Sequence, residues 1–265
     1  MTKKTMKNKH NNMTNITRTI LTALIIMLAA TAARAAKVDT LSVYSQKMKR
    51  SLSTIVYTPD AAGEAKYPVI YLLHGYSGNS TTWPGITDVA RLADTYRTII
   101  VCPDGQNSWY VDSPVDPSMQ FETFISKELP EYIDAHYPTY ARRELRAITG
   151  LSMGGHGAMW NGLQHPDVFG NIGTTSGCMD ICQYPNCWQI EKVLGNMFQN
   201  ETVWKSHSVY YSLDRLLGSR QNIIIDCGYS DFFYPVNLQT HKRLRELNVK
   251  HDFYAVSYTH LRAHE

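Results

Sequence analysis

The feature that most constrains this chain is a serine between two glycines, in Gly150-Leu-Ser152-Met-Gly154. The residues Arg146–Thr149 before it have the pattern of a short strand, and Gly154–Gln164 after it has that of a helix. Glycines are needed where a strand turns so sharply into a helix that side chains would collide with neighbouring backbone. The pattern predicts that Ser152 projects above the sheet as a nucleophile. The alternative is a glycine-rich turn that contains an incidental serine.

Strand and helix patterns alternate along the rest of the chain. The strand patterns are Leu52–Tyr57, Val69–Leu73, Thr98–Val101, Arg146–Thr149, Ile172–Thr175, Ile223–Asp226 and His251–Val256. The helix patterns are Ile86–Tyr96, Phe121–His136, Gly154–Gln164 and Pro235–Leu247. This alternation predicts an α/β fold with a mostly parallel, doubly wound sheet flanked by helices. The stretch from Gly177 to Tyr211 shows neither pattern, and we expect an irregular insertion over the strand ends.

The first 35 residues have the features of an export signal. Basic residues precede an uncharged apolar run from Ile20 to Ala33, and Ala33-Arg34-Ala35 offers small residues to a signal peptidase. The run is too short to span about 30 Å of hydrocarbon. We therefore expect residues 1–35 to be a signal peptide, and a secreted or periplasmic protein without stable membrane insertion after its removal.

The charge and the cysteine spacing give no support for nucleic-acid binding or for a zinc site. The chain has 26 Lys and Arg against 23 Asp and Glu, but the leader holds six of the basic residues, so the remainder carries a net charge of −3. This balance gives no electrostatic case for nucleic-acid binding. The cluster Cys178, Cys182 and Cys187 lacks the spacing of a zinc site, although two of the three could pair in an oxidising compartment. Cys102 and Cys227 end apolar runs and are expected to be buried. We expect no metal and no other cofactor.

A serine hydroxyl attacks an ester only when a base removes its proton and N–H groups receive the oxyanion. The N–H of Met153, at the start of the predicted helix, is one expected donor. The second is expected from the loop after Val69–Leu73, where Tyr76 follows a His74-Gly75 turn. His74 is expected to support this loop rather than to act as the base.

The acid of a catalytic triad is expected after the strand Ile223–Asp226, because the chain order with such a serine turn is serine, acid, histidine. Asp231 is favoured, since it lies past Gly228 in a loop that can turn over the site. Asp226, at the strand end, is the alternative acid or a carboxylate that braces the loop. The role needs a carboxylate that holds the imidazole in one tautomer.

Four segments resemble the putative esterase family, which includes esterase D, S-formylglutathione hydrolases, and feruloyl and acetylxylan esterases. They are Tyr71–Gly78, Pro103–Gly105 with Ser108–Tyr110, Gly150–Gly155 and Asp226–Asp231. The resemblance covers about residues 40–256 and implies an α/β-hydrolase fold. It implies that Ser152 is the nucleophile and Asp231 the acid, with Tyr76 and Met153 as oxyanion donors. With its export signal and aromatic loops, the chain is more similar to the polysaccharide-directed members than to the cytosolic ones.

The C-terminal residues depart from the family pattern. In the family, the base follows the last strand in a Gly-x-His segment, before a Trp and a closing helix. Here Val256 leads into Ser-Tyr-Thr-His260 and five further residues without Gly or Trp, a tail that resembles translated sequencing-adapter read-through. We expect residues 257–265 to be non-native, the C-terminal helix to be missing and the chain as printed to be impaired. His260 is the predicted base by position, and a missing native base is the alternative.

The sequence thus predicts one domain, residues 36–256, that hydrolyses carboxylic esters through an acyl-enzyme. The expected substrates are acetyl or feruloyl esters of plant polysaccharide, or other small esters. Trp109, Tyr110 and Tyr229 lie on predicted loops at the carboxyl ends of strands and are expected to bind substrate, with loop anchoring as the alternative. The competing functions are an acyltransferase of the same fold and a catalytically dead, carbohydrate-binding hydrolase scaffold.

Overall fold

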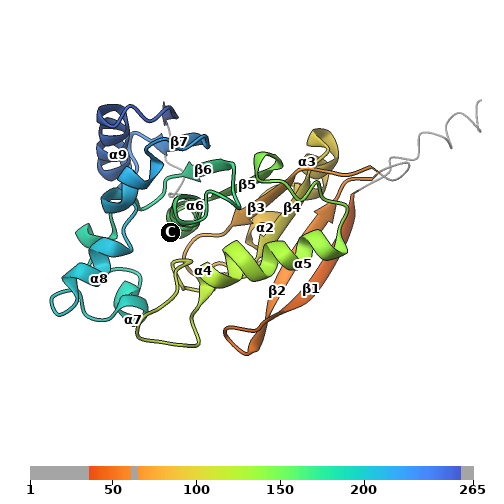
Figure 1. Ribbon diagram of the computed structural model, residues 1–265, viewed down its shortest axis with the longest axis horizontal. Helices are drawn as coiled ribbons and strands as arrows, with labels where there is room; N and C mark the ends of the chain where they lie inside the picture. The colour runs from red at the N-terminus through yellow and green to blue at the C-terminus, as the bar shows by residue number, and fades with distance from the viewer. Residues whose placement is uncertain (1–35, 61–64, 258–265) are drawn as a thin grey trace, which may run out of the picture. The chain divides into compact units, whose positions relative to one another are not determined.

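The computed structural model describes residues 36–60 and 65–257, which form one unit around an eight-stranded sheet (Figure 1). The strands are β1 (Lys37–Ser45), β2 (Arg50–Thr58), β3 (Val69–Leu73), β4 (Ile99–Pro103), β5 (Arg146–Gly150), β6 (Asn171–Thr175), β7 (Asn222–Gly228) and β8 (Asp252–Val256). Their order across the sheet is β1-β2-β4-β3-β5-β6-β7-β8. β2 pairs antiparallel with β1 and β4, and all neighbours from β4 to β8 are parallel. The predicted α/β fold is confirmed.

Strand β1 was not among the predicted strands. It pairs only with β2, so it is an edge strand, and most of its side chains are exposed or half-buried. Polar residues alternate along Lys37–Ser45, with Val43 buried near the end. An edge strand with one solvated face carries few of the apolar residues by which a strand is recognised in sequence.

The helical segments, in chain order, are α2 (Thr82–Ile86), α3 (Val89–Tyr96), α4 (Phe121–Thr123), α5 (Leu129–His136), α6 (Met153–Gln164), α7 (Ile190–Leu194), α8 (Glu201–Ser206) and α9 (Tyr234–Glu246). A π-helical turn, Phe124–Glu128, joins α4 to α5, so the helix predicted over this stretch is continuous but locally widened. Short 3₁₀ turns are Arg143–Leu145, Ile181–Gln183 and Tyr210–Leu216. The stretch predicted to be irregular therefore contains α7, α8 and the Ile181–Gln183 turn, each too short to give a clear helical period.

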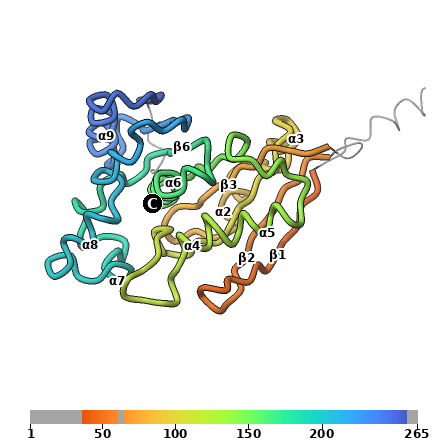
Figure 2. Tube along the Cα trace, in the orientation of Figure 1, coloured from red at the N-terminus to blue at the C-terminus, as the bar shows by residue number. Residues whose placement is uncertain are grey.

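Two layers of side chains cover the sheet on opposite faces. On one face α5 and α6 pack on the sheet, as Figures 1 and 2 show, and their apolar residues join the main core with Tyr71 and Ile148. On the other face, Val89 and Ala93 of α3 pack in a smaller cluster with alternate residues of β2 and β4, such as Ile100. Alternation along each strand divides its residues between the two cores.

The second face is open beside the last strands. Ile224 of β7 is 46% exposed and Tyr254 of β8 is 53% exposed. A groove of about 320 Å³ runs over this face, with Ile70, Ala147 and Gly173 among its lining residues. The predictions of a missing C-terminal helix and a non-native tail concern residues 258–265, which lie outside the described residues.

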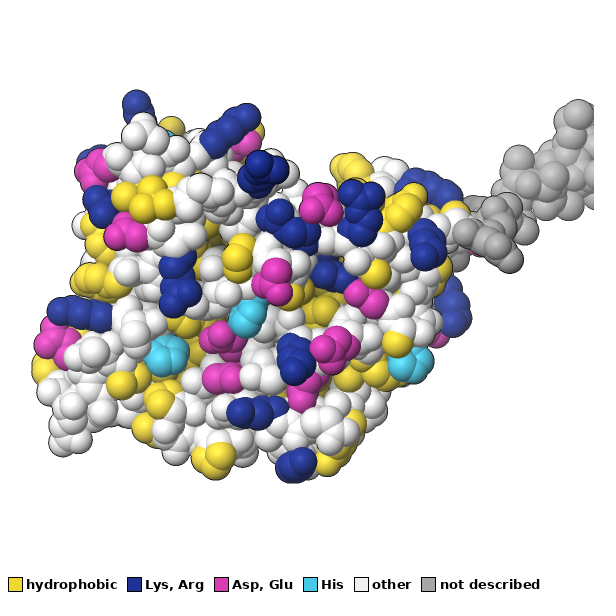
Figure 3. All heavy atoms as spheres, in the orientation of Figure 1, with side chains coloured by type: hydrophobic (Ala, Val, Ile, Leu, Met, Phe, Trp, Pro, Cys, Tyr) yellow, Lys and Arg dark blue, Asp and Glu magenta, His cyan; other side chains and the backbone are white. Residues whose placement is uncertain are grey.

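The distribution of charged side chains and the state of the cysteines agree with what the composition predicts. Figure 3 shows basic and acidic side chains interspersed on one face, with no continuous basic stripe. Within the described ranges, no helix is long and apolar enough to cross a membrane. The five cysteines are free thiols, and Cys102 and Cys227 are buried as predicted. Burial raises the pKa of the Cys102 thiol to about 12, so it is a poor nucleophile.

Candidate active site

Ser152 occupies a strained turn between β5 and α6. Its backbone angles are φ 59° and ψ −117°, which non-glycine residues rarely adopt. Hydrogen bonds fix the turn, because Ser152 N–H donates to Thr175 O and His156 N–H donates to Ser152 O, each at 3.0 Å. The Ser152 side chain is partly exposed, whereas Met153 is buried. Strain held by such constraints is typical of functional residues and matches the geometry predicted for a nucleophile.

The two glycines beside Ser152 are required by close backbone approach. A Cβ atom at Gly150 would lie 2.5 Å from the carbonyl carbon of Gly154. A Cβ atom at Gly154 would lie 2.5 Å from Leu73 O, at the end of β3. These contacts are with rigid backbone, so any side chain would push the turn apart. The predicted reason for the glycines is confirmed.

The loop after β3 lies beside Ser152. A Cβ atom at Gly75 would lie 3.6 Å from Ser152 Cβ, so Gly75 and the adjacent Tyr76 border the nucleophile. Met153 is the first residue of α6, where N–H groups have no partner within the helix and carry partial positive charge. The structure therefore places Met153 directly after the serine and Gly75, the residue before Tyr76, beside it, and the donor roles of Tyr76 and Met153 stay predictions.

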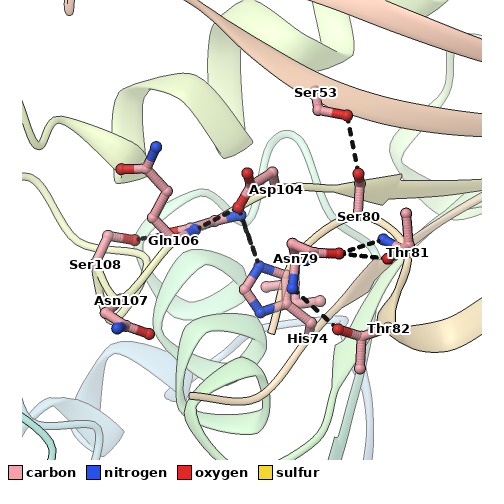
Figure 4. Close-up of polar contacts among 12 residues, drawn as sticks. Ser53, His74, Asn79, Ser80, Thr81, Thr82, Asp104, Gln106, Asn107 and Ser108 are labelled. Atoms are coloured by element: carbon pink, nitrogen blue, oxygen red, sulfur yellow. Dashed lines mark hydrogen bonds and ion pairs between the residues drawn. The ribbon is translucent and has the colours of Figure 1, made fainter. Parts of the chain in front are cut away.

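His74 supports this loop from within, as Figure 4 shows. Gly105 N–H donates to His74 Nε2 at 2.9 Å, and His74 Nδ1 lies 2.7 Å from Gly75 O. Because a backbone N–H can only donate, Nε2 accepts, and the proton on Nδ1 is donated to Gly75 O. The ring is buried and both of its nitrogens are engaged. His74 is a supporting residue, as predicted.

Trp109 and Tyr110 are buried, so the substrate-binding role predicted for them is wrong. Both have positive φ, 58° and 59°, which is uncommon for aromatic residues. The Tyr110 hydroxyl donates to His74 O at 3.0 Å, and Trp109 Nε1 donates to Trp188 O at 3.4 Å. Burial raises the pKa of Tyr110 well above its usual value. These buried side chains hold the loops around the site in place, which was the alternative interpretation.

Asp231 lies in the loop after β7 with only 4% of its surface exposed. Its Oδ1 accepts the Phe233 N–H at 2.9 Å, and its own N–H donates to Gly228 O at 3.1 Å. The competing Asp226 stays within β7 and lines the groove on the open face of the sheet. This placement favours Asp231 as the acid of the site.

The remaining predicted site residues lie at the end of the described chain. Tyr229 is exposed, its N–H donates to Val256 O at 2.9 Å, and its ring meets Tyr234 edge-on at 5.5 Å. Its ring is open to a substrate, so its role stays a prediction. The predicted base, His260, lies outside the described residues.

Two aromatic residues near Asp231 were missed. Trp188 and Phe232 stack at 5.6 Å although 44 residues separate them. The only signal in the sequence is local, a high density of aromatic residues around each of them. Pairing between the two loops cannot be read from that density.

A buried imidazole lies one turn after the nucleophile. His156 is fully buried on α6, with Nδ1 3.1 Å from Trp109 O and Nε2 3.1 Å from His207 O. A neutral ring can donate to only one of these carbonyls. Desolvation nevertheless lowers the pKa of His156 to about 4, because the charged form is poorly solvated in the core.

This burial predicts acid destabilisation. The unfolded chain binds a proton at His156 near pH 6.5, whereas the folded chain binds it only near pH 4. Stability is therefore complete above about pH 6.5 and falls by about 3 kcal/mol as the pH drops to 4. His156→Gln should flatten this slope in the free energy of unfolding, measured by denaturant titration across that range. His136→Gln, at an exposed histidine, is the matched control, and equal slopes in both variants would contradict the prediction.

Fold and site together define an α/β hydrolase with a serine on a tight turn at the carboxyl edge of the sheet. The sequence model of the putative esterase family matches residues 45–259. The chain belongs to that family and is a carboxylic ester hydrolase.

Individual relatives agree with this assignment. An acetyl esterase from Caldicellulosiruptor saccharolyticus is 28% identical over 192 residues, which cover 69% of this chain and 70% of that protein. A solved ferulic acid esterase has a TM-score of 0.69 and 27% identity, with 86% of this chain and 92% of the other covered. The substrate-bound serine hydrolase FphF of Staphylococcus aureus has a TM-score of 0.77 and 23% identity, covering 87% and 94%, and shares the fold.

Proposed function

We propose that Ser152 attacks the carbonyl carbon of an ester and forms an acyl-enzyme, which water then hydrolyses. The observation that carries the proposal is the strained Ser152 turn, held between β5 and α6 with the Gly75–Tyr76 loop beside it. In this mechanism, His260 takes the serine proton and gives it to the leaving alcohol. Asp231 orients that imidazole and offsets its transient charge.

The tetrahedral intermediate carries a negative oxygen that must be stabilised at once. Tyr76 N–H and Met153 N–H are the proposed donors, since they flank Ser152 and Met153 begins a helix. The hydrogen bonds of His74 to Gly75 and Gly105 hold the donor loop in position before the substrate arrives. Donors held in position in advance need no reorganisation in the transition state.

The proposed substrates are acetyl or feruloyl esters of plant polysaccharide, or other small esters. The support is the similarity to an acetyl esterase and to a ferulic acid esterase, together with exposed aromatic residues in the loop of Asp231. Export to the periplasm or the medium is part of the proposal, since polymeric substrates do not enter cells. Its support is the leader pattern in residues 1–35.

A fluorophosphonate probe tests the nucleophile directly. The full chain should be labelled stoichiometrically, and mass spectrometry should place the adduct on Ser152, because only an activated serine reacts rapidly. Adding a sugar alcohol as acceptor during turnover of an acetyl ester should leave free acid as the main product. A chain that is not labelled, or is labelled elsewhere, would contradict the proposed role of Ser152. Acylated sugar as the main product would indicate an acyltransferase.

A further inference from the structure

A fully buried asparagine on α9 links two segments that border the site. Asn237 Nδ2 donates to Phe233 O and to Gly177 O, each at 2.8 Å. Because carbonyl oxygens can only accept, the amide nitrogen must face both of them. The first bond lies within one turn of α9, whereas the second reaches back 60 positions along the chain to the loop after β6. Asn237 therefore joins α9 to that loop.

One end of this link is the loop of the proposed acid. Phe233 O accepts from Asn237, and Phe233 N–H donates to Asp231 Oδ1 at 2.9 Å. Both groups belong to one fully buried residue, so a bond that restrains its carbonyl also restrains the N–H that holds the carboxylate. α9 packs beside β7, whose end leads into Asp231 (Figure 1). The position of the carboxylate therefore depends on the position of α9.

The other end of the link packs against the helix of the nucleophile. Gly177 follows β6, whose last residue, Thr175, accepts the Ser152 N–H at 3.0 Å. A Cβ atom at Gly155, in the first turn of α6, would lie 2.8 Å from Gly177 Cα, so the two backbones are in direct contact. The carbonyl of Gly177 is thus fixed relative to Ser152.

The remaining contacts of Asn237 give no other reason for an amide at this position. Its Oδ1 is buried and accepts no hydrogen bond from any described residue. An unpaired acceptor in the core costs free energy, which an apolar side chain would avoid. A single hydroxyl is enough for a bond within α9, as Thr240 shows by donating to Val236 O at 2.9 Å. What the amide adds is the connection between two carbonyls from separate segments.

We propose that Asn237 is a positioning residue that sets the distance between the Ser152 turn and the Asp231 carboxylate. This inference rests on the proposed function of Ser152 and Asp231, and it adds a buried residue that acts only through the acid. A displacement of about 1 Å in such a site can lower the rate about 10²-fold. The bridge from α9 to Gly177 prevents that displacement.

A double-mutant cycle in the full chain tests the inference. Asn237→Leu keeps the branched shape of the side chain and removes both donors, and it should lower kcat for p-nitrophenyl acetate about tenfold or more with KM unchanged. In a chain that already carries Asp231→Asn, the same substitution should cause no further loss, because Asn237 acts through Asp231. Additive losses in kcat, or a loss confined to KM, would overturn the inference and leave the esterase activity standing.

The pH profile separates positioning from stability. A carboxylate held against an imidazole raises the pKa of that imidazole, so a loosened Asp231 should move the acid limb of kcat/KM to lower pH by about one pH unit. Asn161→Leu is the matched control, since Asn161 is fully buried on α6 and donates from Nδ2 to Gly157 O and Tyr110 O. It should lower the unfolding midpoint but leave the acid limb in place. Equal shifts in both variants, or none in Asn237→Leu, would overturn the inference.

Asn237→Thr covers the case in which the leucine variant fails to fold. Its single hydroxyl can keep the bond to Phe233 O but cannot also reach Gly177 O. The threonine variant should therefore show the same fall in kcat and the same shift of the acid limb. Full kcat in this variant would overturn the inference.

Hydrogen exchange separates the inference from the proposed function. Without the bridge, exchange at Phe233 N–H, followed by NMR, should be about tenfold faster in Asn237→Thr than in the unsubstituted chain. Unchanged exchange would overturn the inference whatever the chain hydrolyses. Faster exchange in a chain that turns over no ester would support the bridge and refute the proposed function.

Discussion

Replacing Ser152 with alanine is expected to lower kcat for p-nitrophenyl acetate by about 10³-fold or more relative to the unsubstituted chain. The reason is that the acyl-enzyme cannot form without the hydroxyl, and the members of a triad act as a unit, so that no partner compensates. Binding and the oxyanion donors remain, which leaves a small residual rate. The measurement is initial rate against substrate concentration, with the folded state checked by thermal unfolding.

Ser206→Ala is the matched control, because Ser206 is an exposed serine on α8, away from the turn at Ser152. It should keep the rate of the unsubstituted chain. If the Ser152→Ala variant retained more than about a tenth of that rate, far above the loss expected for a nucleophile, Ser152 would not be the nucleophile.

Asp231→Asn is expected to cost about 10⁴-fold in kcat while the protein stays folded, because an amide favours the wrong imidazole tautomer. The buried Oδ1 would still accept the Phe233 N–H, so the loop should keep its conformation. The comparison is Asp226→Asn, at a residue on the open face of the sheet, which should act on stability rather than on kcat. The values of kcat and the unfolding midpoints of both variants test this assignment. If Asp226→Asn lowered kcat and Asp231→Asn lowered only the stability, Asp226 would be the acid.

Local chemistry explains what could be predicted from the sequence. The residues that identify the turn around Ser152 lie within five positions of it, although the close backbone contacts that require Gly150 and Gly154 include Leu73 O on β3. Seven of the eight described strands were identified from the sequence by short runs rich in apolar residues, which in the central strands are buried on both faces or nearly so. The supporting role of His74 also followed from its position next to Gly75.

Other features depend on how distant segments pack. Whether Trp109 and Tyr110 point outward or inward depends on two left-handed residues in succession, which no propensity predicts. The choice of Asp231 over Asp226 rested on its position along the loop. The burial of Asp231 and the hydrogen bond that it accepts from Phe233 N–H support this choice. Short helices in the stretch after β6 are stabilised by tertiary packing rather than by their own length.

The α/β alternation, the serine turn and the family could be identified from the sequence by itself, because each is specified by residues that are close together or that repeat with a regular period. Only the tertiary structure decided which aromatic residues are anchors and which are open to a substrate. Trp109 is buried, whereas Trp188 and the half-exposed Phe232 stack where the loops after β6 and β7 meet. The physical reason is that the exposure of a side chain depends on how the loops after separate strands pack together. The residues next to it in the sequence do not specify that packing.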